Sequence, residues 1–243
     1  MTFFTPRIIP HPALVPGLQS AIRNPQSAIM MFTMPYPVSV RVEPLLFPRD
    51  RMTTAFRLIL AIPHLFLVGG IGFSMVFRTG RADIIALGPE TGVLGFVAAI
   101  LAIVSWFTIL FRHEHFPGIR QYTLYYLRWR VRALSYLMLL EDQYPPLGDA
   151  PYPATLTVVD PAEPRDLLSV GLRILLAVPH FLVLACLLTA WWLTTIVAWF
   201  VILVTLRYPR GLYNFGVFCF QWLIRVEAYM LLLVDEYPPF SFD

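Results

Sequence analysis

The sequence predicts an all-α membrane protein in which four transmembrane helices form two tandem hairpin repeats. Two observations support this fold class. Of the 243 residues, 58% are hydrophobic and only 14% are charged, whereas a soluble domain usually carries about 25% charged residues. In addition, most of the chain after residue 35 occurs twice, and internal repetition is the first feature to use when an architecture is assigned.

The amino-terminal segment, residues 1–35, differs from the rest of the chain. It has no charged start followed by an apolar run, so its pattern is not that of a signal peptide. We expect either a disordered tail or a mis-assigned start, with the true start at Met30, Met31 or Met34.

Two copies of one unit follow, at residues 36–149 and 150–243. The paired segments are YPVSVRV and YPATLTV, then FRLILAIPHLFLV and LRILLAVPHFLVL, then RWRVRALSYLMLLEDQYPP and QWLIRVEAYMLLLVDEYPP. Equivalent residues are 116 apart as far as His64 and 93 apart from Trp106 onward. The first copy therefore contains an insertion of 23 residues between these two positions.

The order of these motifs resembles a bacterial membrane family, domain of unknown function 4389. The resemblance covers both copies, and it implies a membrane domain without an established activity. The first copy departs from the pattern at HEHFPG, where the second copy has LRYPRG.

The apolar segments are predicted to form two hairpins. Between Asp166 and Arg207 the second copy has one charged residue, Arg173. As a single helix this segment would measure about 60 Å, against about 30 Å for the hydrocarbon core of a bilayer. We therefore predict a tight turn near residues 186–191. The four predicted spans are residues 56–77, 93–111, 167–186 and 189–206.

A further apolar segment follows each hairpin, at residues 119–140 and 212–234. In the first of these, Arg128, Arg130 and Arg132 would each cost about 2.5–3.5 kcal/mol at the centre of a bilayer. We therefore predict interfacial amphipathic helices with aromatic residues at headgroup level. The two YP segments alternate in polarity, and they are predicted to be short cytoplasmic β-strands that pair with each other.

The distribution of arginine predicts the orientation. All eighteen basic residues are arginines, and only Arg78 and Arg81 lie on the side of the predicted hairpin turns. Because cytoplasmic segments carry an excess of basic residues, we predict a multi-pass protein of the bacterial cytoplasmic (inner) membrane with both termini in the cytoplasm.

Each copy places an arginine and a Pro-His pair in its first apolar segment. Arg57, His64, Arg173 and His180 therefore form a candidate intramembrane polar site. Three interpretations remain open. The histidines fix helix packing, or they are axial ligands to a haem or another metal, or the four residues form an anionic-lipid or proton site.

Two other groups were considered as binding sites. His113, Glu114 and His115 offer zinc ligands, but alternate residues of a helix do not share a face, which favours a solvated cluster. A second set is interleaved with aromatic residues, a pattern that also occurs in nucleic-acid-binding proteins. On a membrane-surface helix it favours contacts with anionic lipid headgroups. This second set comprises Arg120, Arg128, Arg130, Arg132 and Arg225.

No catalytic motif such as GxSxG, HExxH or a phosphate-binding loop occurs in the sequence. We therefore predict a non-enzymatic scaffold or accessory subunit that binds lipids or a membrane complex, without a cofactor and without nucleic acid. The alternatives are a transporter of lipids or small solutes, a proton path, or a haem or metal protein ligated by both Pro-His histidines.

Overall fold

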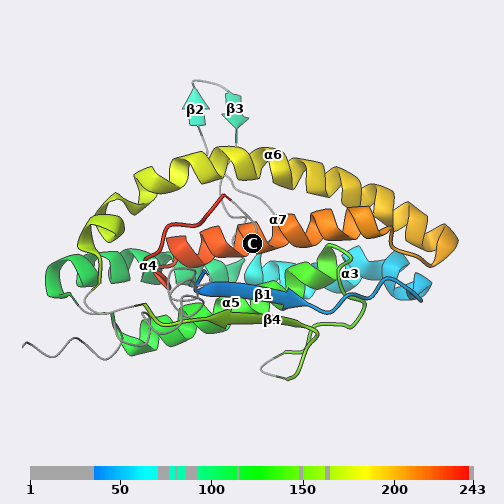
Figure 1. Cartoon of the computed structure of the whole chain (residues 1–243), viewed down its shortest axis with the longest axis horizontal. Helices are drawn as coiled ribbons and strands as arrows, with labels where there is room; N and C mark the ends of the chain where they lie inside the picture. Colours follow the sequence, from blue (N-terminus) through cyan, green and yellow to red (C-terminus); the bar gives the residue numbers. More distant parts are fainter. Residues whose placement is uncertain are drawn as a thin grey trace, which may run out of the picture. The chain divides into compact units, whose positions relative to one another are not determined.

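The computed structural model describes residues 36–70, 77–79, 82–85, 92–113, 115–147, 150–161 and 165–240. The predicted amino-terminal tail, residues 1–35, and Glu114 lie outside these ranges. The described part of the chain is mainly helical, with five helices and two small antiparallel sheets (Figure 1). The predominantly helical class is therefore as predicted.

The elements follow the order of the two copies. The first copy contains β1 (Val38–Val42), α3 (Arg51–Val68), α4 (Val93–Arg112) and α5 (Pro117–Leu137). The second contains β4 (Ala154–Val158), α6 (Leu167–Thr205) and α7 (Arg210–Met230). Between α3 and α4, β2 (Phe77–Thr79) pairs with β3 (Ala82–Ile85).

The predicted pairing of the two YP segments is confirmed. β1 and β4 are antiparallel, and their register is symmetric about the pair of Val40 and Leu156, which are equivalent positions of the two copies. In both strands alternate side chains are buried. Because side chains alternate between the two faces of a strand, one face of this pair lies against the helices.

The predicted turn at residues 186–191 is wrong, because α6 is one continuous helix of 39 residues. The prediction relied on bilayer thickness alone, and the segment from Cys186 to Trp191 contains neither glycine nor proline to stop a helix. The prediction of four spans in two hairpins is corrected accordingly.

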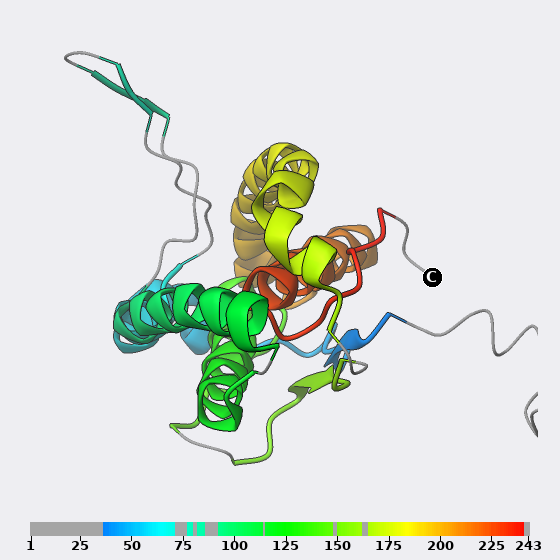
Figure 2. The ribbon, with the colours of Figure 1, turned by 90° about the vertical axis from the view of Figure 1, so that its left-hand side faces the viewer.

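In the first copy, α3 and α4 meet end to end. A Cβ atom added to Gly92 would lie 2.5 Å from the backbone nitrogen of Gly69, so the start of α4 touches the end of α3. Figures 1 and 2 show the two helices in line with each other. Their combined length matches that of α6, and residues 70–92 are the insertion that interrupts this helix in the first copy.

The helices α5 and α7, which were predicted to be interfacial, lie between the other elements of the described structure. Viewed end on, α6 and the α3–α4 pair form one layer, α5 and α7 a second, and β1 with β4 a third (Figure 2). The middle layer contributes more residues to the hydrophobic core than either of the other two layers, among them Leu127, Val131, Phe220 and Leu223. On the side of α7 that faces the strands, Gln221 donates a hydrogen bond to the Val40 carbonyl.

The outer layer carries the exposed apolar surface. Among the described residues, most large apolar side chains that are exposed belong to α3, α4 or α6, and α5 and α7 contribute none. These three helices are long and apolar enough to span a membrane. Two tryptophans connect them reciprocally, because Trp106 Nε1 donates to the Val170 carbonyl and Trp199 Nε1 donates to the Thr54 carbonyl. We call the exposed faces of α3, α4 and α6 the apolar layer.

Candidate functional site

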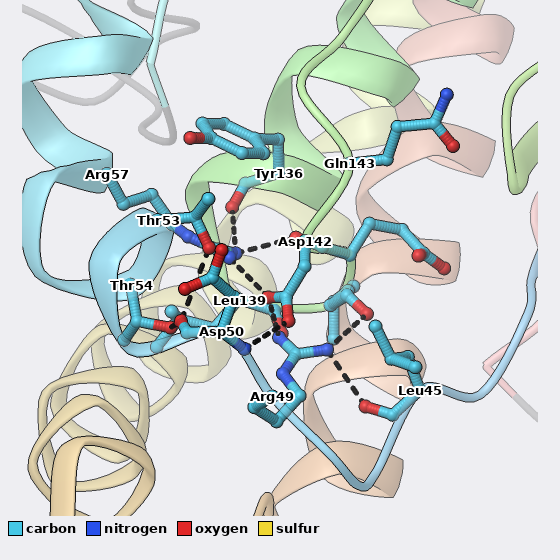
Figure 3. Close-up of polar contacts among 12 residues, drawn as sticks. Leu45, Arg49, Asp50, Thr53, Thr54, Arg57, Tyr136, Leu139, Asp142 and Gln143 are labelled. Atoms are coloured by element: carbon cyan, nitrogen blue, oxygen red, sulfur yellow. Dashed lines mark hydrogen bonds and ion pairs between the residues drawn. The ribbon is translucent and has the colours of Figure 1, made fainter. Parts of the chain in front are cut away.

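Arg57 belongs to a cluster of polar groups in the first copy, drawn in Figure 3. Its Nη2 donates to Asp142 Oδ1 at 2.5 Å, and its Nη1 donates to the carbonyls of Tyr136 and Glu141 at 2.7 and 2.6 Å. Arg49 Nη2 lies 3.0 Å from the same Asp142 oxygen and also donates to the Leu139 carbonyl. We call Arg49, Arg57 and Asp142 the first arginine cluster.

The second copy repeats this arrangement. Arg165 and Arg173 both donate to Asp235 Oδ1, at 2.6 and 2.9 Å. Arg165 also donates to the Leu232 carbonyl at 3.0 Å, and Arg173 donates to the Tyr229 carbonyl. These three charged residues are the second arginine cluster.

The two clusters stabilise the ends of α5 and α7. The last carbonyls of a helix have no partner within the helix and carry partial negative charge. Arg57 and Arg173 donate to such carbonyls, those of Tyr136 and Tyr229. The second arginine of each cluster donates to a carbonyl of the turn that follows the helix, and the aspartate compensates the charge of both arginines. Arg57 and Arg173 are only 1% and 2% exposed, so these contacts explain why each copy retains a charged residue in an apolar helix.

The two histidines are held in the same way in both copies. Trp129 Nε1 donates to His64 Nδ1, and Trp222 Nε1 donates to His180 Nδ1, each at 3.1 Å. The ring of His64 also contacts Tyr144, with a centroid distance of 5.0 Å. These contacts join the outer helices to the middle layer, which favours the packing interpretation of the Pro-His pairs.

The arrangement does not fit a haem or metal held by these histidines. A neutral imidazole has one nitrogen with a lone pair and one that carries hydrogen. In His64 and His180 the lone pair of Nδ1 already accepts the indole N–H, so Nε2 carries the hydrogen and has no lone pair for a metal. No group of three or more potential metal ligands occurs among the described residues.

Three of the predicted headgroup arginines have partners inside the protein. Arg120 donates to the Leu233 carbonyl at 2.8 Å and pairs with Asp160. Arg225 lies 5.5 Å from the centre of the Tyr36 ring. Arg130 is fully buried. None of these three has the free guanidinium that a headgroup contact requires.

Arg128 and Arg132 lie elsewhere, beside the strand layer. They border a polar pocket of about 350 Å³ between α5 and β4, together with Tyr152 and Thr155. Arg128 is exposed. Of the predicted arginine set, Arg128 is therefore the exposed member beside this pocket.

Arg130 binds the end of α3, where the helix of the first copy is interrupted. Its Nη1 donates at 2.6 Å to the carbonyl of Val68, the last residue of α3. Its Nε lies 2.8 and 2.9 Å from the two carboxylate oxygens of Glu227. In the second copy the helix is continuous, and the equivalents of Arg130 and Glu227 across the copies are Leu223 and Leu134. The ion pair is thus present only where the helix is broken.

Two further titratable groups are perturbed by burial. Burial raises the pKa of Glu141 to about 7, with Arg49 opposing and Asp142 reinforcing the shift. Burial lowers the pKa of His115 to about 4, and Arg165 and Arg120 add to this effect. His115 is therefore neutral at pH 7.

His113 and His115 do not come together as the zinc site that the sequence suggested. His115 Nε2 lies 3.1 Å from Ser105 Oγ, whereas His113 ends α4 in a left-handed conformation and is exposed.

One cavity of the described structure was not predicted from the sequence. It is a groove of about 440 Å³ between α4 and α6, with Ala99 and Ala102 on one wall and Phe181 on the other. Tyr126 and Glu227 from the middle layer reach its floor. The sequence feature that could have indicated this groove is a set of small residues in α4 whose equivalents in the second copy are large or polar.

In the comparison with known proteins, the chain matches a family model. The model of the family "domain of unknown function (DUF4389)" matches residues 90–147 and 168–241, one segment in each copy. Searches of the curated proteins and of the solved structures found no match.

Proposed function

The chain belongs to the DUF4389 family, whose function is unknown, and we propose that it is a non-enzymatic membrane scaffold or accessory subunit. It binds lipids through the apolar layer and presents its strand layer to a partner in a membrane complex. The observation that carries this proposal is the concentration of exposed large apolar side chains on α3, α4 and α6.

The length of the apolar layer supports an orientation along the membrane. On α6 the exposed apolar face runs from Leu168 to Val204, which is about 54 Å of helix. To fit this face into a hydrocarbon core of about 30 Å, a spanning helix would need a tilt of about 55°, beyond the usual range of up to about 40°. The α3–α4 pair has the same length. We propose that the layer lies flat in one leaflet, which immerses the whole apolar face.

The opposite surface is suited to water and to a partner. The exposed residues of the two strands are polar, namely Ser39, Arg41, Thr155 and Thr157. We propose that this surface, and with it both termini, is on the cytoplasmic side of the bacterial inner membrane, which the distribution of arginine favours. Arg128 then faces the cytoplasm beside the polar pocket that Arg132 also borders, and its exposed guanidinium can bind a carboxylate-rich or phosphorylated partner surface.

The partner prediction can be tested by comparing two variants. Arg128→Ala with Arg132→Ala is expected to lose a stoichiometric partner that wild-type protein retains when it is purified from its own membranes in mild detergent. The control is Gln121→Ala, also exposed on α5. Native mass spectrometry measures the composition of each complex. Unchanged retention of both partner and lipids in the double arginine variant would contradict the proposal.

A further inference from the structure

The groove between α4 and α6 differs from the equivalent place in the second copy. Along α4, Gly95, Ala99 and Ala102 line the groove, and their equivalents are Leu188, Trp192 and Thr195. The first copy therefore leaves space where the second copy is filled.

The floor of the groove differs between the copies as well. Tyr126 lies under α4, and a Cβ atom at Gly95 would come within 2.8 Å of its hydroxyl. Tyr126 and Glu227 contribute to the floor, but they are only 4% and 7% exposed. Their equivalents are Cys219 and Leu134. Both the α4 wall and the floor of the groove therefore consist of residues that differ from their equivalents in the other copy.

The groove opens onto the apolar layer. Ile103 on α4 and Ile174 on α6 both line it, and they are 59% and 66% exposed on the outer surface. A molecule in the groove would therefore be in contact with the lipid that surrounds the layer. The walls offer apolar contacts to this molecule. Glu227 on the floor is nearly covered, so it adds little polar surface to the groove.

We propose that this groove binds one acyl chain of a bilayer phospholipid, an inference that rests on the membrane location proposed above. The volume is of the order of a single acyl chain, and the walls are aliphatic and aromatic. Continuity with the lipid-facing surface favours a bilayer lipid over a water-soluble ligand. The protein would thus carry a specific lipid in addition to the lipid that surrounds it.

The test uses substitutions taken from the second copy. Ala99→Trp with Ala102→Thr introduces the residues found at the equivalent positions and fills the groove. Ile100→Trp is the control, because it adds a tryptophan on the exposed outer face of the same helix. Each protein is loaded from phosphatidylglycerol vesicles, delipidated in mild detergent and analysed by native mass spectrometry.

Wild-type protein and the Ile100→Trp control are expected to keep one phospholipid per chain. Occupancy in the filled variant should be about tenfold lower, because losing the burial of about two methylene groups already weakens binding by roughly this factor. Equal occupancy in all three proteins, or detergent alone in the wild type, would overturn the proposal.

A second measurement addresses variants that fail to fold. In wild-type protein, a phospholipid with a photoactivatable group on its acyl chain is expected to label α4 and α6 at the groove. Labelling spread evenly over the apolar layer would contradict a specific site. Binding to vesicles distinguishes the two proposals, because a filled groove should leave it unchanged, whereas a failure of wild-type protein to bind vesicles would refute the membrane location itself.

Discussion

Replacing Asp235 with asparagine is expected to lower the free energy of unfolding by about 3 kcal/mol, at the lower end of the range for breaking a buried ion pair. The change leaves Arg165 and Arg173 facing each other without a carboxylate. Both arginines are almost fully buried, whereas the Asp235 side chain is 12% exposed. This partial exposure places the expected value at the lower end.

Asp160→Asn provides the control for this prediction. Asp160 pairs with Arg120, but its side chain is 85% exposed, so its loss should cost at most about 1 kcal/mol. Equilibrium unfolding in mixed detergent micelles measures both values. Equal stability of the two variants would show that the second arginine cluster does not hold the end of α7.

Replacing Arg130 with leucine is expected to cost about 3–5 kcal/mol, because Glu227 remains as an unpaired buried charge. The Val68 carbonyl also loses its donor. Glu227→Leu alone should be similarly damaging, since it leaves Arg130 without its carboxylate. Each substitution introduces the leucine found at the equivalent position of the other copy, Leu223 for Arg130 and Leu134 for Glu227.

The double variant Arg130→Leu with Glu227→Leu is expected to recover much of this loss. Its remaining cost is the unsatisfied Val68 carbonyl, about 1–3 kcal/mol. A double-mutant cycle measures the coupling energy between the two residues. If the two single costs simply added in the double variant, the ion pair would not be the coupled unit described here.

Much of the fold was predictable because both copies repeat the same contacts. The pairing of β1 with β4 followed from two alternating segments at equivalent positions. The arginine clusters were also within reach, since arginine and aspartate recur at the equivalent positions Arg57 and Arg173, and Asp142 and Asp235. Only the arginines were predicted as site residues, because their aspartates lie 85 and 62 residues away in the chain.

Other features were not predictable from the pattern of one segment. Hydrophobicity indicates that α6 avoids water, but it does not indicate how the helix lies in a membrane. The turn that bilayer thickness suggested has no residue to form it. The groove depends on differences between the copies, such as Ala99 against Trp192, and these become meaningful only when the helices that surround them are known.

The depth of α6 in a bilayer tests the proposed flat orientation most directly. Leu168, Cys186 and Val204 are exposed and 18 residues apart, which is five helical turns, so all three lie on one face. A spin label is attached to Cys186, or to Leu168→Cys or Val204→Cys in a Cys186→Ala background. Cys219 is buried, and burial raises its pKa to about 12, so it should not react.

Relative accessibility to oxygen and to a water-soluble nickel reagent then reports the depth of each label in phospholipid vesicles. We expect equal, hydrocarbon-level depth at the three positions. A deep label at Cys186 with both end labels at headgroup level would show that α6 crosses the bilayer, and would contradict the proposal that the apolar layer lies in one leaflet.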